Sequence, residues 1–327
     1  MDRRALIASG ACAALAALGG PARAQPARRP ARIGWLGIKG SGQAQDAVPL
    51  DGLRAGLRER GWIEGGNCII DAQYGDFTTA RDLTLALVQA KADLIVAQGG
   101  MIFRAREPAG ATPLIFQING DPVEAGLVAS YARPGGTLTG VTNLSQELSA
   151  KRVELLKEAL PQMSRLAAIA NQGHPGWRLE HEATLAATRK LGLALTWLPV
   201  YKADEVPAAL EAAGASGAQG LVAVPDNLIL GQARAIAAFA QARRLPAISG
   251  WGEFTEAGNL MSYGPALREV FAMMASYADR ILKGARPADL PIENPTRVEL
   301  VVNRRLAQQL DLRLPPAILV RADRVAG

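Results

Sequence analysis

Short apolar runs typical of β-strands alternate with helical segments along most of this chain. Strands joined by helical crossovers lie parallel, and the helices cover both faces of the sheet that they form. The first half of the chain therefore predicts one doubly wound α/β unit. We expect its strands at 32–38, 69–74, 94–97, 114–118 and 138–141, and its helices at 48–60, 80–90, 101–107 and 121–132.

The same alternation begins again after Asn143, which predicts a second unit with its own hydrophobic core. Its strands are expected at 165–170, 194–200, 220–224 and 246–249, and its helices at 153–160, 177–191, 204–213 and 229–243. An extended piece at 260–264, a strongly periodic helix at 267–282 and a last strand at 298–302 follow. The predicted fold class is α/β, with two doubly wound, Rossmann-like lobes.

The first residues have the pattern of a secretory signal peptide. Arg3-Arg4 forms a positive start, residues 5–18 form an apolar run too short to span a bilayer comfortably, and an Ala-x-Ala cleavage site ends at Ala24. We therefore predict a signal peptide at 1–24, a mature chain that begins at Gln25, and a periplasmic location. The two arginines leave Sec export and twin-arginine export both open.

Polar and glycine residues follow the predicted strands of the first unit, and ligands of open α/β sheets bind outside these carboxyl ends. Gly99-Gly100 and Asn119-Gly120 each end a strand and open a predicted helix, so their backbone N–H groups suit a carboxylate. Gly99-Gly100 equally fits a plain glycine turn, and Asp121 fits either a helix N-cap or a ligand contact. The candidate ligand-binding residues here are Ser41, Gln98, Gly99, Gly100, Asn119, Asp121 and Asn143.

The second unit has matching candidates after its own strands. They are Asn171, Asp226, Asn227, Trp251 and Tyr263. Trp251 fits either stacking on a ligand ring or capping a core, and Tyr263 is ambiguous in the same way. His174 lies in a strand-end loop and is a further candidate contact, whereas His181, between two glutamates on a predicted helix, is expected to be solvated.

Catalysis, metal binding and nucleotide binding have little support in the sequence. The chain has two histidines, neither beside a serine or cysteine motif, no G-x-S-x-G elbow and no cluster with metal-ligand spacing. Gly40-Ser41-Gly42 lacks the third glycine of a dinucleotide fingerprint, because position 45 is Gln45. The net charge is +6, but the lysines and arginines form no basic stripe interleaved with aromatic residues. We expect neither an enzyme nor a metal, a cofactor or a nucleic-acid partner.

Several stretches carry a resemblance to a known family. Residues 118–130 read Ile-Asn-Gly-Asp-Pro-Val-Glu-Ala-Gly-Leu-Val-Ala-Ser, and 132–140 read Ala-Arg-Pro-Gly-Gly-Thr-Leu-Thr-Gly. With 245–250, 256–264, 281–293 and 299–303, they resemble the ABC-transporter substrate-binding protein family that includes the tryptophan- and tyrosine-binding lipoproteins. The resemblance covers nearly all the chain after residue 31. The family usually has Thr-Pro after the first glycine of the 98–100 loop, whereas this chain has Gly100-Met101.

The resemblance implies a fold like that of type I periplasmic binding proteins, with a multi-crossing hinge. Lobe 1 would comprise 31–143 plus about 263–292, and lobe 2 would comprise 144–262 plus about 293–327. The implied function is the periplasmic solute-binding component of an ABC importer. It would capture a small carboxylate-bearing solute by hinge closure, with aromatic amino acids as the family precedent.

The implied partner is an ABC permease in the inner membrane, and the protein is expected to be a monomer. Two alternatives stay open. One is a ligand-sensing partner of a membrane receptor. The other is an exported α/β enzyme, which would need a nucleophile with an adjacent base.

Overall fold

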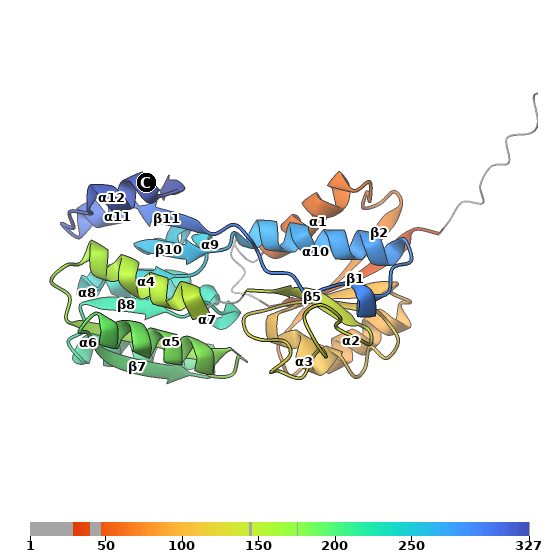
Figure 1. The fold of residues 1–327 in the computed structure, drawn as a ribbon, viewed down its shortest axis with the longest axis horizontal. Helices are drawn as coiled ribbons and strands as arrows, with labels where there is room; N and C mark the ends of the chain where they lie inside the picture. The colour runs from red at the N-terminus through yellow and green to blue at the C-terminus, as the bar shows by residue number, and fades with distance from the viewer. Residues whose placement is uncertain (1–28, 40–46, 144–145, 175, 327) are drawn as a thin grey trace, which may run out of the picture. The chain divides into compact units, whose positions relative to one another are not determined.

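A computed structural model of the protein describes residues 29–39, 47–143, 146–174 and 176–326 (Figure 1). The predicted signal peptide and its cleavage site, as well as Ser41, lie outside these described residues. Within them the chain builds two sheets, which we call sheet 1 and sheet 2.

Sheet 1 has five parallel strands in the order β2-β1-β3-β4-β5. All five strands predicted for the first unit are confirmed. In this strand order the chain reverses direction across the sheet between β1 and β3, and ligands of doubly wound folds bind at that position. The strands are β1 (Ala31–Ile38), β2 (Cys68–Gly75), β3 (Leu94–Gln98), β4 (Leu114–Ile118) and β5 (Leu138–Thr142).

Helices cover both faces of sheet 1. On one face α10 (Leu267–Leu282) lies beside α1 (Val48–Glu59), and their apolar residues enclose Trp35, whose ring centroid is 5.5 Å from that of Phe271 (Figure 1). On the other face α2 (Ala80–Gln89) and α3 (Ile102–Ala105) cover a second cluster around Phe116. A helix from the last quarter of the sequence therefore completes the core of sheet 1.

Sheet 2 has seven strands in the order β12-β11-β10-β9-β8-β6-β7, and only the β10–β11 pair is antiparallel. Its strands are β6 (Arg165–Asn171), β7 (Ala194–Val200), β8 (Gly220–Ala223), β9 (Ala247–Ser249), β10 (Met261–Gly264), β11 (Glu299–Asn303) and β12 (Arg324–Ala326). The four strands predicted between 165 and 249 are confirmed as β6, β7, β8 and β9.

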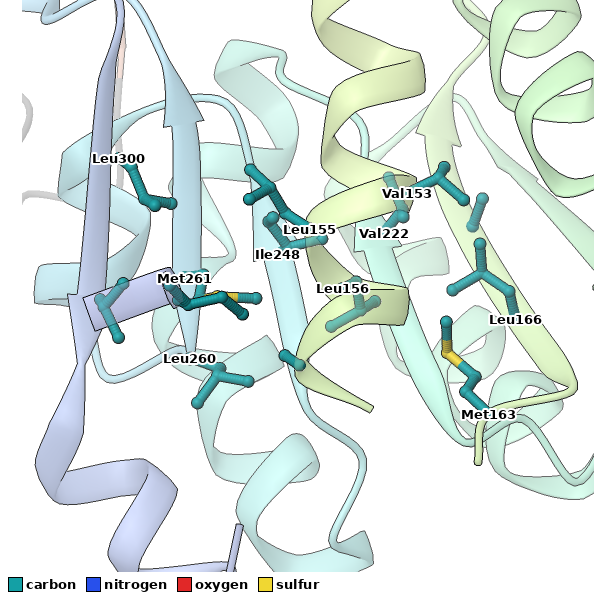
Figure 2. Packing of buried hydrophobic residues seen from close by; sticks show 14 of the residues in the cluster. Val153, Leu155, Leu156, Met163, Leu166, Val222, Ile248, Leu260, Met261 and Leu300 are labelled. Carbon is teal, nitrogen blue, oxygen red and sulfur yellow. The ribbon is translucent and has the colours of Figure 1, made fainter. Parts of the chain in front are cut away.

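Successive residues of the central strands point to opposite faces of sheet 2, so each face has its own core. On one face Leu156 of α4 packs with Leu166, Val222 and Ile248 (Figure 2). The other core contains Ala167, which follows Leu166 directly in β6. The helices associated with sheet 2 are α4 (Gln146–Ala159), α5 (Trp177–Lys190), α6 (Val206–Ala215), α7 (Asn227–Gly231), α8 (Ala233–Arg243), α9 (Gly252–Glu256), α11 (Arg304–Gln309) and α12 (Pro316–Arg321).

The chain passes between the two sheets three times: after β5, after β10, and between α10 and β11. The last crossing runs beside β5, where Val141 forms a parallel bridge with Glu293 and the Thr142 N–H donates to the Glu293 carbonyl at 3.0 Å. Two α/β lobes joined by several crossings are the predicted architecture, and the structure has it.

The predicted helix at 121–132 is wrong. The Ala125 N–H donates to the Asp121 carbonyl at 3.0 Å, which closes one turn, and irregular chain follows. Gly126 has a φ of +66°, a left-handed conformation that ends the turn before a second one can form.

Two other predicted helices are interrupted or shorter. The segment 229–243 divides near Gln232 into α7 and α8, and 101–107 contains only the four-residue α3 after a 3₁₀ turn at Gly99–Met101. Within the described ranges, no helix combines the length and apolar character needed to cross a membrane.

Candidate ligand-binding site

The carboxyl ends of strands from both sheets meet around one small cavity. Sheet 1 contributes the ends of β3 and β4, and sheet 2 contributes the segments that follow β6 and β8. The cavity volume is ≈ 20 Å³, which is room for roughly one water molecule. It is lined by Gly99, Gly100, Gln117, Ile118, Asn119, His174, Asp226 and Asn227. Among the described residues, neither lysine nor arginine lines it.

Gln98 ends β3 and ties the two lobes together. Its side-chain oxygen accepts from the Ile38 N–H at 3.0 Å, and its amide nitrogen donates to the Asn227 Oδ1 at 3.1 Å. The side chain is only 8 % exposed. Gln98 therefore lies beside the cavity, with its amide committed to contacts within the protein.

Gly99 lies close to the second lobe and has a backbone conformation that favours glycine. Its φ is +55°, and a Cβ there would lie 2.8 Å from the Asn227 Nδ2. Gly100 has open space at the Cβ position. Because α3 is only four residues long, the carboxylate site predicted here depends on individual backbone N–H groups rather than on a long helix dipole.

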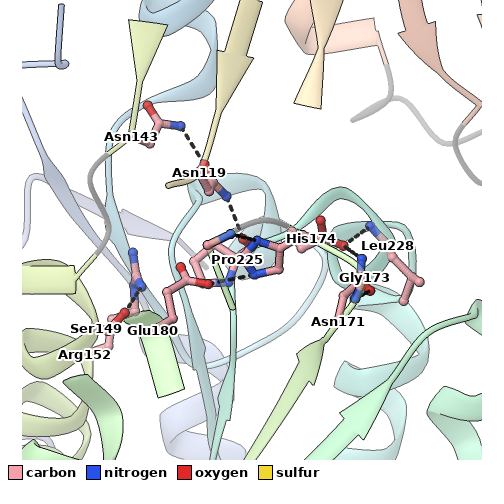
Figure 3. Close-up of polar contacts among 12 residues, drawn as sticks. Asn119, Asn143, Ser149, Arg152, Asn171, Gly173, His174, Glu180, Pro225 and Leu228 are labelled. Carbon is pink, nitrogen blue, oxygen red and sulfur yellow. Dashed lines mark hydrogen bonds and ion pairs between the residues drawn. The ribbon is translucent and has the colours of Figure 1, made fainter. Parts of the chain in front are cut away.

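Asn119 is the centre of an amide network that crosses from one lobe to the other (Figure 3). Its Oδ1 accepts from the Asn143 Nδ2 at 3.1 Å and from the Gln117 Nε2 at 3.2 Å, while its Nδ2 donates to the Pro225 carbonyl at 2.7 Å. Asn143 is 3 % exposed, and its Oδ1 has no hydrogen-bond partner among the described residues. The structure thus brings the predicted residues Asn119 and Asn143 into direct contact.

Asp226 and Asn171 form the polar wall on the second lobe. The Asp226 Oδ1 accepts from the Asn171 Nδ2 and from the Leu228 N–H, both at 2.8 Å, and the second bond caps α7. The Asn171 Oδ1 accepts from the Gly173 N–H at 2.8 Å. Both described bonds of the Asp226 side chain end on Oδ1, which leaves Oδ2 suited to a cationic group.

His174 is a cavity residue with a buried partner behind it. Its Nε2 lies 2.9 Å from the Glu180 Oε2, and its Nδ1 accepts from the Gly176 N–H at 3.1 Å. The exposed fractions of the two side chains are 6 % and 2 %. Burial lowers the pKa of His174. The Glu180 carboxylate and, more weakly, Asp226 together raise this pKa by more than burial lowers it, so the net shift is upward.

Arg152 of α4 is a fully buried cation in the same lobe. Its Nε donates to the Tyr263 carbonyl at 2.9 Å, and one terminal nitrogen donates to the Ser149 Oγ at 3.4 Å (Figure 3). Burial lowers the pKa of Arg152 to about 10, against the opposing effect of Glu180. Arg152 therefore stays charged at neutral pH and balances part of the buried negative charge.

Three predicted site residues neither line the cavity nor form a described side-chain hydrogen bond to a residue that lines it. Asp121 accepts from the Val123 and Glu124 N–H groups at 2.7 and 3.1 Å, which is the capping role left open by the sequence, although it caps a single turn. Trp251 is 3 % exposed and belongs to the hydrophobic cluster of α1 and α10. Tyr263 is half-buried in β10 and packs against the core of sheet 2.

Sequence reasoning missed Gln117, Ile118, Glu180 and Arg152. For Arg152 a signal existed, because Ser149, Arg152, Val153 and Leu156 share one face of a helix and the last two are apolar. An arginine in that row indicates a buried, partnered charge. Glu180 had no comparable signal, since its partner lies in a loop.

The lining of the cavity consists of groups that orient a polar solute. Over the part of the chain that the structure describes, no three His, Cys, Asp or Glu side chains gather where they could hold a metal ion. Amide groups, backbone N–H groups and one carboxylate dominate the lining, and such groups orient a polar solute.

Comparison with known proteins agrees with this description. The family described as ABC transporter substrate binding protein matches residues 41–326. A tyrosine-binding protein of Clostridioides difficile is 25 % identical over 283 residues, which cover 84 % of this chain and 81 % of that protein.

Solved structures show the same fold. A conserved domain protein from Vibrio cholerae has a TM-score of 0.83 and 25 % identity, and the match covers 91 % of this chain and all of that one. An ABC domain from Streptococcus pneumonia in complex with L-Trp has a TM-score of 0.83 and 24 % identity over 90 % and 99 % of the two chains.

A ligand-free, open substrate-binding protein with adhesive properties from Clostridium difficile has a TM-score of 0.66 and 21 % identity, with 90 % and 99 % of the two chains covered. The matched family is one of substrate-binding proteins, not of enzymes. The family match spans most of the sequence, and the chain belongs to the family of ABC transporter substrate-binding proteins.

Proposed function

We propose that this protein is the periplasmic component of an ABC importer and captures a small solute that carries both a carboxylate and an ammonium group. The observation that carries the proposal is the chemistry of the cavity wall. Asp226 supplies one carboxylate, while amides and glycine backbone groups supply donors. An α-amino acid presents the complementary pair of charges.

The two charged groups of such a solute would meet opposite lobes. The ammonium group fits the Asp226 Oδ2, because a charge-assisted hydrogen bond is about twice as strong as a neutral one. The carboxylate fits the backbone N–H groups at Gly99 and Gly100. This assignment gives the cation-binding role to Asp226 and not to Asp121, which caps a turn away from the cavity lining.

The relatives support an amino acid as the solute class. One curated relative is a tyrosine-binding protein, and one structural neighbour holds L-Trp. The described cavity is lined by a single aliphatic side chain, Ile118, and Trp251 is buried in a hydrophobic cluster. The role of Trp251 as a cover for the apolar part of the solute remains a prediction.

Capture would proceed by closure of the lobes about crossings near Asn143, Tyr263 and Pro295. The proposed lobes are 31–143 with about 263–292, and 144–262 with about 293–327. Direct hydrogen bonds already join the lobes, from Gln98 to Asn227 and from Asn119 to the Pro225 carbonyl. A solute that contacts both lobes would favour the closed arrangement further.

Calorimetric titration of the mature protein tests the solute class. We expect binding of an α-amino acid from a panel that includes L-tyrosine, L-tryptophan and aliphatic amino acids, and weaker binding of aromatic acids without an ammonium group. Asp226→Asn should weaken binding roughly 10- to 150-fold, since it removes a charged hydrogen bond worth about 1.5–3 kcal/mol. The Asn side chain keeps an oxygen for capping α7 and for Asn171.

Asp121→Asn is the matched control, because it makes the same chemical change outside the cavity lining. It should leave affinity unchanged. Tight binding of a neutral sugar without response to any amino acid would refute the solute class. Export is tested separately, by N-terminal sequencing of the secreted protein, which should begin at Gln25.

A further inference from the structure

The two lobes touch where Gly176 of lobe 2 meets Asn119 of lobe 1. A Cβ at position 176 would lie 2.4 Å from the Asn119 carbonyl oxygen and 3.2 Å from the Gly120 Cα. Real Cβ atoms do not approach backbone this closely, so only glycine fits the contact as described. We call this contact between Gly176 and the Asn119-Gly120 peptide the seam.

The backbone at Gly176 is held by an imidazole. The Gly176 N–H donates to the His174 Nδ1 at 3.1 Å, and this bond requires Nδ1 to be unprotonated. The other ring nitrogen, Nε2, faces the Glu180 Oε2 at 2.9 Å and carries the proton of the neutral ring. The described geometry is therefore that of neutral His174 with a fixed tautomer.

Protonation would remove the bond that holds the seam. Imidazolium carries N–H at both nitrogens, so its Nδ1–H would oppose the Gly176 N–H. The attraction of Nε2–H to Glu180 would become stronger at the same time, which keeps the ring in place while Gly176 must move. A shift of Gly176 by a few tenths of an ångström would disturb its packing on the Asn119 carbonyl.

The charges around His174 move this event to a higher pH than that of an ordinary imidazole, because they raise its pKa. Glu180 of α5 and Asp226 after β8 both raise the pKa of His174 against the effect of burial. Arg152 of α4 interacts with Glu180 and keeps its own proton throughout the range, because its pKa is about 10. His174 is thus the group at the seam that takes up a proton as the pH falls.

We propose that His174 is a positioning residue of the seam, and that its protonation loosens lobe closure and weakens solute capture in acid. The inference rests on the lobe closure proposed above. It adds that pH controls this closure. It assigns to Glu180 the role of selecting the tautomer and to Gly176 the role of the contact itself.

Nuclear magnetic resonance of the full mature chain tests the first step without any solute. The chain has only two histidines, so His181→Gln identifies the His174 imidazole signals and serves as the control variant. At alkaline pH we expect a proton on the His174 Nε2 and none on Nδ1. The Gly176 amide signal should then titrate together with the imidazole.

Small-angle scattering over the same pH series tests the second step. The radius of gyration should increase as His174 becomes protonated, and the His181→Gln protein should behave like the wild type. Glu180→Gln should move both the imidazole titration and the scattering transition to lower pH, because it removes the carboxylate that raises the pKa. Gly176→Ala should show the larger radius at every pH.

Three outcomes would overturn the inference. The first is titration of His174 while the radius of gyration stays constant. The second is a scattering transition that occurs at the same pH in Glu180→Gln as in the wild type. The third is a proton on the His174 Nδ1 at alkaline pH. Because none of these measurements uses a solute, failure of the amino-acid titrations would challenge the proposed function and leave this test intact.

Discussion

At the scale of single residues, several buried polar groups in this protein have no complete set of partners. Glu253 of α9 is 8 % exposed, and its Oε2 has no hydrogen-bond partner among the described residues. Burial raises the pKa of Glu253 to about 7, helped by Glu256 and Glu299 and opposed by Arg324. A buried acid of this kind is stable in its neutral form and costly when ionised.

We expect Glu253→Gln to stabilise the protein above neutral pH. The folded pKa of about 7 lies above the ordinary value of 4.5, so the wild type loses stability as pH rises between these values. At pH 8 the variant should gain about 1–3 kcal/mol in unfolding free energy, and at pH 4 the gain should vanish. Denaturant unfolding of the wild type and the variant at both pH values measures this gain in unfolding free energy. An equal difference at both would contradict the ionisation argument.

At the scale of elements, the pairing of α1 with α10 explains how distant segments form one core. Leu50, Leu53 and Leu57 gave α1 its predicted apolar face, and all three are buried. The close approach depends on Gly52 and Gly56, where a Cβ would lie 2.5 Å from the Arg268 carbonyl and 2.6 Å from that of Ala272. Two glycines four residues apart on the apolar face permit this helix contact.

Gly56→Ala should therefore destabilise the protein, although alanine favours helices by about 1 kcal/mol over glycine. Pushing α10 away from α1 should give a net loss of about 1–3 kcal/mol in a denaturant melt. Gly231→Ala is the control, because Gly231 also lies in a helix, α7, but has open space at its Cβ position. Equal stability of the two variants would show that the helices adjust without strain.

At the scale of the whole molecule, the candidate site exists only where two lobes meet. Gln98 and Asn119 of lobe 1 donate to Asn227 and Pro225 of lobe 2. The cavity between them has a volume of ≈ 20 Å³, which is smaller than an amino acid. Solute entry therefore requires the lobes or the lining side chains to move from the arrangement described here.

Binding of an amino acid should make the protein more compact in solution. The solute would contact both lobes and shift the population towards closed forms. Small-angle scattering at alkaline pH, with and without saturating amino acid, should show a smaller radius of gyration for the complex. Asp226→Asn at the same concentration should retain the larger radius. An identical profile for free and saturated protein would argue against hinge closure.

The sequence by itself determined the elements and their order. Alternating strand and helix patterns are local, so β1 to β9 and most helices could be predicted from periodicity alone. The error at 121–132 arose because Asp121, Pro122 and Glu124 do favour a helix start, whereas the left-handed Gly126 ends the turn. A capping pattern shows where a helix can begin, and the residues after it determine whether the helix continues.

Only the tertiary structure decided which candidates belong to the site. Asn119, Asp226 and Asn227 follow strands in different sheets, and their contact depends on how the lobes close. Trp251 and Asp121 have the same strand-end position in the sequence, yet one enters a hydrophobic cluster and the other caps a turn. Strand-end residues are predictable from local pattern, whereas a binding site requires distant residues to meet, and that depends on long-range packing.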